Sequence, residues 1–291
     1  MNTLLIFIRL LRLKQWVKNT FIFFPLFFAG GLFKPHLLAD CIQTFFGFCF
    51  IASGLYILND FLDREKDRLH PKKSHRPLVK FAVNPLLITF LVLGLVLWGV
   101  FLCSRVNTAV MITALVYIII HLVYNFFTKK IVIIDVAFVA IGFQIRVWAG
   151  AAAAMVAPSV WLQMCVFLLA LFLGFTKRRH EISTLKEMAP EHRNVLEHYT
   201  AYLLDQMIII CSTLTIVFYG LYTLSFSMNY RISHQYMVYS VAFVIYGIFR
   251  YLYLVHVQKK GDDAGEALLS DRPLFISVIL WIVYVGFVIY G

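Results

Sequence analysis

The chain has 291 residues, of which 61% are hydrophobic and 14% are charged. Soluble domains are about half apolar and a quarter charged, so this composition excludes an ordinary soluble protein and predicts an integral membrane protein. The formal net charge of +11 is what basic cytoplasmic loops give a membrane protein, and it provides no reason to expect nucleic acid as a partner.

The N-terminal segment, residues 1–15, alternates Arg9 and Arg12 with apolar side chains, which predicts an amphipathic helix on the membrane surface. No cleavage signal follows, so the first apolar stretch is expected to stay as an anchor. A transmembrane helix needs roughly 20 apolar residues. The predicted spans are Trp16–Phe33, Cys41–Phe61, Val83–Cys103, Thr108–Phe127, Ile131–Ala153, Val160–Phe175, Met207–Phe226, Tyr236–Val255 and Pro273–Tyr290. The pattern predicts an all-α membrane protein of about nine transmembrane helices, with residues 1–291 as a single domain.

Lysine and arginine gather in alternate loops, which sets the orientation of these spans. By the positive-inside rule, the N-terminus and the loops 62–82 and 177–205 are cytoplasmic, and the two loops are expected to cap the protein there. Nearly all acidic residues lie in or beside the same loops, with Asp40 as the exception. A transporter or lipid flippase would place ionisable groups near the bilayer midplane, and only Arg146 is a candidate there, so an enzyme is favoured.

The second predicted span ends in the run Asn59-Asp60-Phe61-Leu62-Asp63-Arg64-Glu65-Lys66-Asp67. At about 100° per residue, Asn59 and the three aspartates lie within about a third of the helix circumference. Grouped carboxylates repel each other unless a cation lies among them, and such hard oxygen ligands suit Mg²⁺ bound to a diphosphate. The alternative is a helix end stabilised by ion pairs with the neighbouring basic residues. In the basic loop that follows, Lys73 and Arg76 can reach phosphates held by the metal.

Two ionisable residues lie inside the fifth predicted span. Asp135 is about one turn into an apolar segment, where a carboxylate is costly without a partner. Arg146 lies on nearly the same helix face but roughly 16 Å farther along, so the two cannot pair directly. Arg146 could meet a lipid phosphate or satisfy helix carbonyl groups, and both interpretations stand. Lys129 and Lys130 flank the preceding turn, where topology alone can explain them.

The N-D-x-x-D-x-x-x-D run, followed by R-P at Arg76, resembles the UbiA superfamily of intramembrane prenyltransferases. The resemblance implies nine helices around a central cavity, with Mg²⁺ and a diphosphate at its cytoplasmic mouth. It makes Asn59, Asp60, Asp63 and Asp67 the metal ligands, and the three aspartates catalytic. The superfamily's second acidic pair, D-x-x-x-D after the sixth helix, is replaced here by Lys177 and Glu181.

Further stretches are similar to one branch of that superfamily, the decaprenyl-phosphate phosphoribosyltransferases. This implies transfer of 5-phosphoribose from phosphoribosyl diphosphate to a polyprenyl monophosphate in the cytoplasmic membrane, for the arabinose donors of cell-envelope glycans. Such a donor carries an extra phosphate, which fits added cations at Lys177 and Arg178. The alternative is an aromatic prenyltransferase of quinone or lipid biosynthesis. The predicted substrate-binding residues are Lys14, Gln15, Lys18, Asn19, Lys73, Arg76, Tyr124, Lys129, Lys130, Asp135, Arg146, Lys177, Arg178, Glu181 and Arg250.

Overall fold

The computed structural model describes residues 10–68, 73–80, 84–185, 194–225, 236–258 and 264–291. Within these ranges the chain forms helices joined by short connections, and none of these residues forms a strand. The predicted all-α class is therefore confirmed. Of the predicted surface helix, residues 1–9 lie outside the described ranges.

Eight helices of the described chain are long and apolar enough to cross a membrane. They correspond to the second to ninth predicted spans, and their bounds differ from the predictions mainly at the ends. These helices are α3 (Pro35–Leu62), α6 (Pro85–Ser104), α7 (Thr108–Phe126), α8 (Ile134–Ala153), α9 (Val160–Leu185), α11 (Ala201–Ser225), α13 (Val241–His256) and α15 (Arg272–Tyr290). The shorter elements between them are α4 (Arg64–Arg68), η2 (Lys73–His75), α5 (Pro77–Lys80), η3 (Thr128–Lys130), η5 (Asn194–His198), η6 (Val238–Ser240) and α14 (Ala264–Ser270).

The first predicted span is not a regular α-helix. It consists of a 3₁₀-helix of 11 residues, η1 (Leu13–Phe23), and an α-helix of 5 residues, α2 (Phe24–Phe28). At about 2.0 Å per residue in the first and about 1.5 Å in the second, the two extend about 30 Å, which is the thickness of the hydrocarbon core. The segment is therefore long enough for a ninth crossing. Arg12 has φ of 51°, in the left-handed region, and so separates η1 from the residues before it. The predicted helix over 1–15 is therefore wrong at its C-terminal end.

The residues of this segment that contact other helices are three positions apart in the sequence. A 3₁₀-helix places side chains with this spacing on one face, which explains why the segment adopts this type of helix. On that face, Trp16 donates to the Ser53 hydroxyl of α3 at 3.1 Å, and Asn19 accepts from Arg146 of α8 at 2.6 Å. Ile22 follows, and a Cβ added to Gly150 of α8 would lie 1.9 Å from its carbonyl oxygen. Only glycine allows this approach, which seats η1 between α3 and α8.

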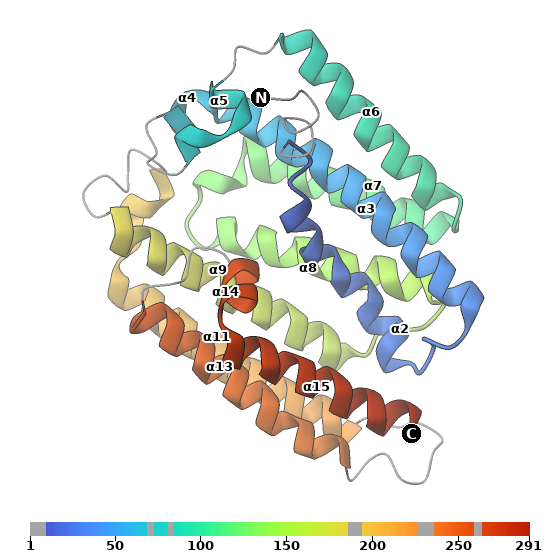
Figure 1. Ribbon diagram of the computed structural model, residues 1–291. Helices are drawn as coiled ribbons and strands as arrows, with labels where there is room; N and C mark the ends of the chain where they lie inside the picture. The colour runs from blue at the N-terminus through green and yellow to red at the C-terminus, as the bar shows by residue number, and fades with distance from the viewer. Residues whose placement is uncertain (1–9, 69–72, 81–83, 186–193, 226–235, 259–263) are drawn as a thin grey trace.

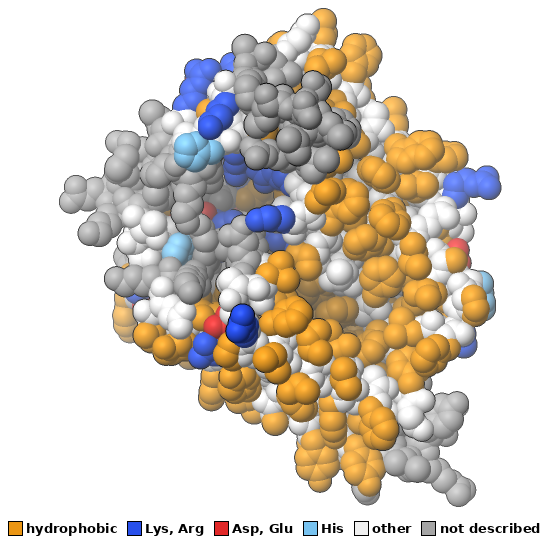
Figure 2. Space-filling model, viewed as in Figure 1, with side chains coloured by type: hydrophobic (Ala, Val, Ile, Leu, Met, Phe, Trp, Pro, Cys, Tyr) orange, Lys and Arg blue, Asp and Glu red, His pale blue; other side chains and the backbone are white. Residues whose placement is uncertain are grey.

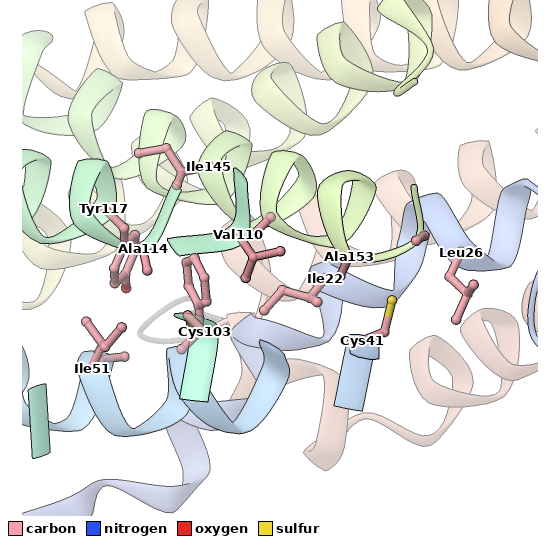
Figure 3. Packing of buried hydrophobic residues seen from close by; sticks show 14 of the residues in the cluster. Ile22, Leu26, Cys41, Ile51, Cys103, Val110, Ala114, Tyr117, Ile145 and Ala153 are labelled. Atoms are coloured by element: carbon pink, nitrogen blue, oxygen red, sulfur yellow. The ribbon is translucent and has the colours of Figure 1, made fainter. Parts of the chain in front are cut away.

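The long helices pack mostly against their neighbours in sequence. Close contacts join α3 to α6, then α7 to α8, α8 to α9, α9 to α11, and α13 to α15 (Figure 1). The C-terminal helix returns to the N-terminal segment, where the Tyr290 hydroxyl donates to the Phe27 carbonyl at 2.8 Å. Figure 3 shows part of the core, in which η1 and α2 meet α3, α6, α7 and α8 through Ile22, Leu26, Cys41, Ile51, Cys103, Val110, Ala114, Tyr117, Ile145 and Ala153.

Candidate active site

One face of the protein is hollowed, and lysine and arginine side chains gather around the hollow (Figure 2). In the same view of the ribbon, this region lies between α4 and α5 on one side and α14 on the other (Figure 1). The helices α4 and α5 belong to the predicted cap loop 62–82, of which residues 69–72 and 81–82 lie outside the described ranges. The predicted acidic run leads directly into α4.

Asp60 lies in the last turn of α3 and is bound by two arginines. The Arg12 Nη2 atom donates to both carboxylate oxygens, at 2.5 and 2.6 Å, and Arg76 Nη1 donates to one of them at 2.8 Å. Arg76 also pairs with Asp67 of α4. Because Asp60 and Asp67 are only 6% and 5% exposed, the two guanidinium groups supply the compensation that buried carboxylates need.

Asp63 interrupts the helix between α3 and α4, and its side chain takes a different direction from the other two. With φ of −91° and ψ of 5° it forms the C-cap of α3, and its carboxylate accepts from Lys129 Nζ at 2.7 Å. The predicted single stripe is therefore divided, with Asp60 and Asp67 sharing Arg76 and Asp63 bound to the turn between α7 and α8. Asn59 stays in the last turn of α3, where its carbonyl accepts from the Asp63 N–H at 2.9 Å.

The oxygen-rich chemistry of this set fits Mg²⁺, but the side chains are not gathered as a metal site gathers them. Among the described residues, no three His, Cys, Asp or Glu side chains converge closely enough to hold a metal. Each aspartate instead holds a cation of the chain itself. A metal would have to exchange with these cations to bind the same carboxylates.

A second ion cluster joins α8 to α9. Asp135, which is 0% exposed, accepts from Arg178 Nε at 2.8 Å and from the Tyr199 hydroxyl at 2.9 Å. Arg178 Nη1 also donates to Glu181 at 2.8 Å. Asp135 thus has the partner that its place in an apolar segment requires, and this partner is 43 residues away in the chain.

Tyr199 connects this cluster to a strained turn. Its hydroxyl accepts the N–H of Ile133 at 2.7 Å, a β-branched residue with φ of 68°, where such side chains are rarely found. Burial, and then the neighbouring charge of Asp135, raise the pKa of Tyr199. The hydroxyl therefore keeps its proton and holds η5 against the turn that carries Lys129.

The predicted cap loop 177–205 is largely helical. The span helix α9 continues to Leu185, so Lys177, Arg178 and Glu181 lie on that helix, and α11 begins at Ala201. Residues 186–193 lie outside the described ranges. Lys177 is half-buried and lies on α9 four residues before Glu181, and Tyr124 at the end of α7 lies within electrostatic range of Arg178.

Arg146 lies inside the helical assembly and binds protein acceptors. Its N–H groups donate to the Gly142 carbonyl at 2.7 Å, to Asn19 at 2.6 Å and to the Tyr117 hydroxyl at 2.6 Å. The guanidinium also lies 4.7 Å from the centre of the Tyr117 ring. These contacts favour the helix-carbonyl interpretation of Arg146, with the addition that it ties η1 to α8.

Arg250 of α13 is bound to Asp271, which directly precedes α15. Its guanidinium donates to both Asp271 oxygens, at 3.0 and 2.8 Å, and the same carboxylate caps the N-terminus of α15 by accepting from Leu274 N–H at 2.9 Å. This geometry gives Arg250 a structural role at the start of α15, and its contact with substrate stays a prediction.

The other residues predicted to bind substrate differ in how exposed they are. Lys14 and Lys130 are exposed, whereas Gln15 and Lys18 are half-buried and share one face of η1 because they are three residues apart. The backbone of Lys73 lies in η2, and its side chain is outside what the structure describes.

Arg12 and Tyr199 are the residues that sequence reasoning missed. The sequence pattern places Arg12 in the predicted surface helix, and its pairing with Asp60 spans 48 residues, so no local pattern indicates the contact. The three-residue spacing of Trp16, Asn19 and Ile22 was a usable signal for η1, and it would have placed Arg12 at the start of a buried helix.

Comparison with known proteins identifies the family of the chain and relatives of its fold. Residues 20–279 match the UbiA prenyltransferase family. The chain is 30% identical to a decaprenyl-phosphate phosphoribosyltransferase of Corynebacterium glutamicum over 97% of its length and 86% of the relative's. It is 31% identical to the enzyme of that name from Mycolicibacterium smegmatis, over 97% and 92%. Its fold is similar to that of a UbiA homologue from Archaeoglobus fulgidus bound to GPP and Mg²⁺, with a TM-score of 0.75 at 19% identity, covering 98% and 99% of the two chains. The chain is a multi-pass membrane protein and a transferase, and it belongs to the UbiA prenyltransferase family.

Proposed function

We propose that this protein transfers 5-phosphoribose from phosphoribosyl diphosphate to a polyprenyl monophosphate and releases diphosphate. Relatives about 30% identical over nearly the whole chain carry the name of that activity. Nearly full-length coverage supports the same arrangement of spans and loops in this chain.

One feature of the structure favours phosphoribosyl transfer over prenyl transfer. At the position of the superfamily's second acidic pair, Lys177 directly precedes Arg178 on α9, and Arg178 engages both Glu181 and Asp135. The cluster is organised by a cation, with its carboxylates already bound. A donor with a second phosphate is the partner for an added lysine here, because a prenyl diphosphate ends in hydrocarbon.

The chemistry assigned to the site follows from its charges. Asn59, Asp60, Asp63 and Asp67 would hold Mg²⁺, which would supply positive charge to the leaving diphosphate. Lys177 holds the 5-phosphate and so fixes the ribose. The bond from C1 to the diphosphate oxygen breaks, and a phosphate oxygen of the lipid forms the new bond to C1. This nucleophile is already anionic, so no general base is assigned.

The location of the reaction is part of the proposal. The positive-inside rule places the N-terminus and the site on the cytoplasmic side of the cell membrane, where a soluble sugar donor meets the lipid acceptor. The product, a polyprenyl-phosphoryl 5-phosphoribose, would then feed arabinose donors for the cell envelope.

The test uses the purified full chain in detergent with labelled phosphoribosyl diphosphate, a polyprenyl monophosphate, and Mg²⁺ or a chelator. We expect labelled lipid only with Mg²⁺, and none from Asp63→Asn, whose exchange keeps the shape of a partly exposed side chain. Lys177→Asp should raise KM for the donor. Turnover of an isoprenoid diphosphate with an aromatic acid, without labelled lipid from the sugar donor, would replace this proposal by the aromatic prenyltransferase. Activity retained by Asp63→Asn would remove that residue from the metal site.

A further inference from the structure

The three aspartates at the end of α3 and in α4 are matched in number by three cations, whereas Glu65 of α4 pairs separately with Arg64 and Arg68. Asp60, Asp63 and Asp67 contribute three negative charges. Arg12, Arg76 and Lys129 contribute three positive charges, and each is within hydrogen-bond distance of at least one of these carboxylates. The formal charge of this six-residue group is therefore zero before any ligand binds.

Arg12 occupies both carboxylate oxygens of Asp60, which a metal would need as ligands. A single nitrogen, Nη2, lies 2.5 and 2.6 Å from the two carboxylate oxygens. Its backbone is held in the left-handed region, with φ of 51°, which costs a non-glycine residue conformational energy. The neighbouring chain is fixed by the Ser53 hydroxyl, which donates to the Leu11 carbonyl at 2.7 Å. The fold therefore directs this guanidinium at the carboxylate.

A neutral group of this kind responds differently to a metal alone and to a metal with a diphosphate. A free divalent cation meets no net attraction, and every carboxylate it takes leaves an arginine or lysine without its counter-charge. A metal bound to a diphosphate compensates both sets of charges. The metal binds the carboxylates, and the phosphate oxygens accept hydrogen bonds from the displaced arginine and lysine side chains. The three basic side chains are partly exposed, so their charged ends can move toward a ligand.

We propose that Arg12, Arg76 and Lys129 are exchange partners, which neutralise the aspartates in the empty site and pass to the diphosphate when it arrives with its metal. This deepens the proposed function and rests on it. Arg12 is thereby both a competitor of the metal and a ligand of the donor. The device makes the binding of metal and donor mutually dependent, so that the site does not fill with metal alone.

The test depends on effects of opposite sign. With the purified full chain in detergent, Mn²⁺ alone is titrated by the electron paramagnetic resonance signal of the free ion. Retention of labelled inorganic diphosphate on immobilised protein is measured separately in excess Mn²⁺. Arg12→Gln leaves a net negative group, so Mn²⁺ alone should bind roughly tenfold tighter, whereas diphosphate retention should weaken roughly tenfold.

Two further variants make the test specific. Lys129→Gln should act in the same two directions through Asp63, which keeps the test decisive if Arg12→Gln fails to fold. Arg179→Gln is the matched control, because it removes a positive charge that is paired with Asp205 of α11 at 2.9 Å, outside the acidic group. It should leave both affinities unchanged.

Each other outcome has a defined meaning. Unchanged or weaker Mn²⁺ binding in both Arg12→Gln and Lys129→Gln overturns the exchange, and so does tighter Mn²⁺ binding with diphosphate retention unaltered. Either result leaves the proposed transfer intact, provided the wild-type chain retains diphosphate with Mn²⁺. If the wild-type chain retains none, the proposed function itself fails.

Discussion

The buried ion pair between Asp135 of α8 and Arg178 of α9 offers a test of how much this contact stabilises the fold around the site. Asp135 is 0% exposed and Arg178 is 4% exposed, and removing one partner of a buried ion pair costs about 3–5 kcal/mol. In Asp135→Asn, Glu181 still compensates Arg178 and the amide still accepts from Tyr199. We therefore expect the lower end of that range, about 3 kcal/mol, and about 4 kcal/mol for Arg178→Met, which leaves a buried carboxylate without this cation.

The double variant distinguishes a direct pair from two independent losses. If the carboxylate and guanidinium compensate each other, Asp135→Asn with Arg178→Met should cost about 2 kcal/mol less than the sum of the single changes. The measurement is unfolding in mixed detergent and dodecyl sulfate micelles, followed by circular dichroism. A control cycle on Arg179 and Asp205, which are more exposed, should show coupling below about 1 kcal/mol. Additive costs at Asp135 and Arg178 would refute the reasoning.

Two further changes probe the frame of the site. Gly150→Ala places a methyl group 1.9 Å from the Ile22 carbonyl oxygen and should displace η1, lowering stability by about 3 kcal/mol and weakening donor binding. Gly220→Ala, where no atom lies within 4 Å, should do neither, and equal effects of the two would contradict the close approach. Arg250→Gln should lower the thermal midpoint with KM unchanged, because Arg250 holds Asp271 at the cap of α15. A selective rise in KM would return Arg250 to the substrate site.

The helices were predictable because the bilayer imposes a length and a composition on each span. Eight spans correspond to predicted stretches, and their ends shifted where polar residues continue a helix, as in α9, which runs on to Leu185. The first span differs from the prediction in its type of helix, and this difference has a physical origin. Burial between α3 and α8 selects a three-residue period for η1, and hydropathy averaged over a window does not detect periodicity.

The site was predictable in its composition but not in its pairings. The acidic run and Lys177 stand out in the sequence because acids cluster there and because a lysine replaces an expected aspartate. The cost of a carboxylate in an apolar segment correctly indicated that Asp135 needs a partner. That partner, Arg178, and the contact of Arg12 with Asp60 depend on how distant helices pack. Basic residues near the ends of membrane spans are so common that charge alone does not single out Arg178 and Arg12.

The fate of each part of a doubly labelled donor tests the central claim most directly. Phosphoribosyl diphosphate would carry tritium in the ribose and ³²P in the diphosphate, and would be incubated with the purified chain, a polyprenyl monophosphate and Mg²⁺. Transfer of phosphoribose predicts tritium in the lipid extract and ³²P in water as free diphosphate, in equal molar amounts. Recovery of ³²P in the lipid, or release of diphosphate without tritium in the lipid, would contradict the proposed reaction.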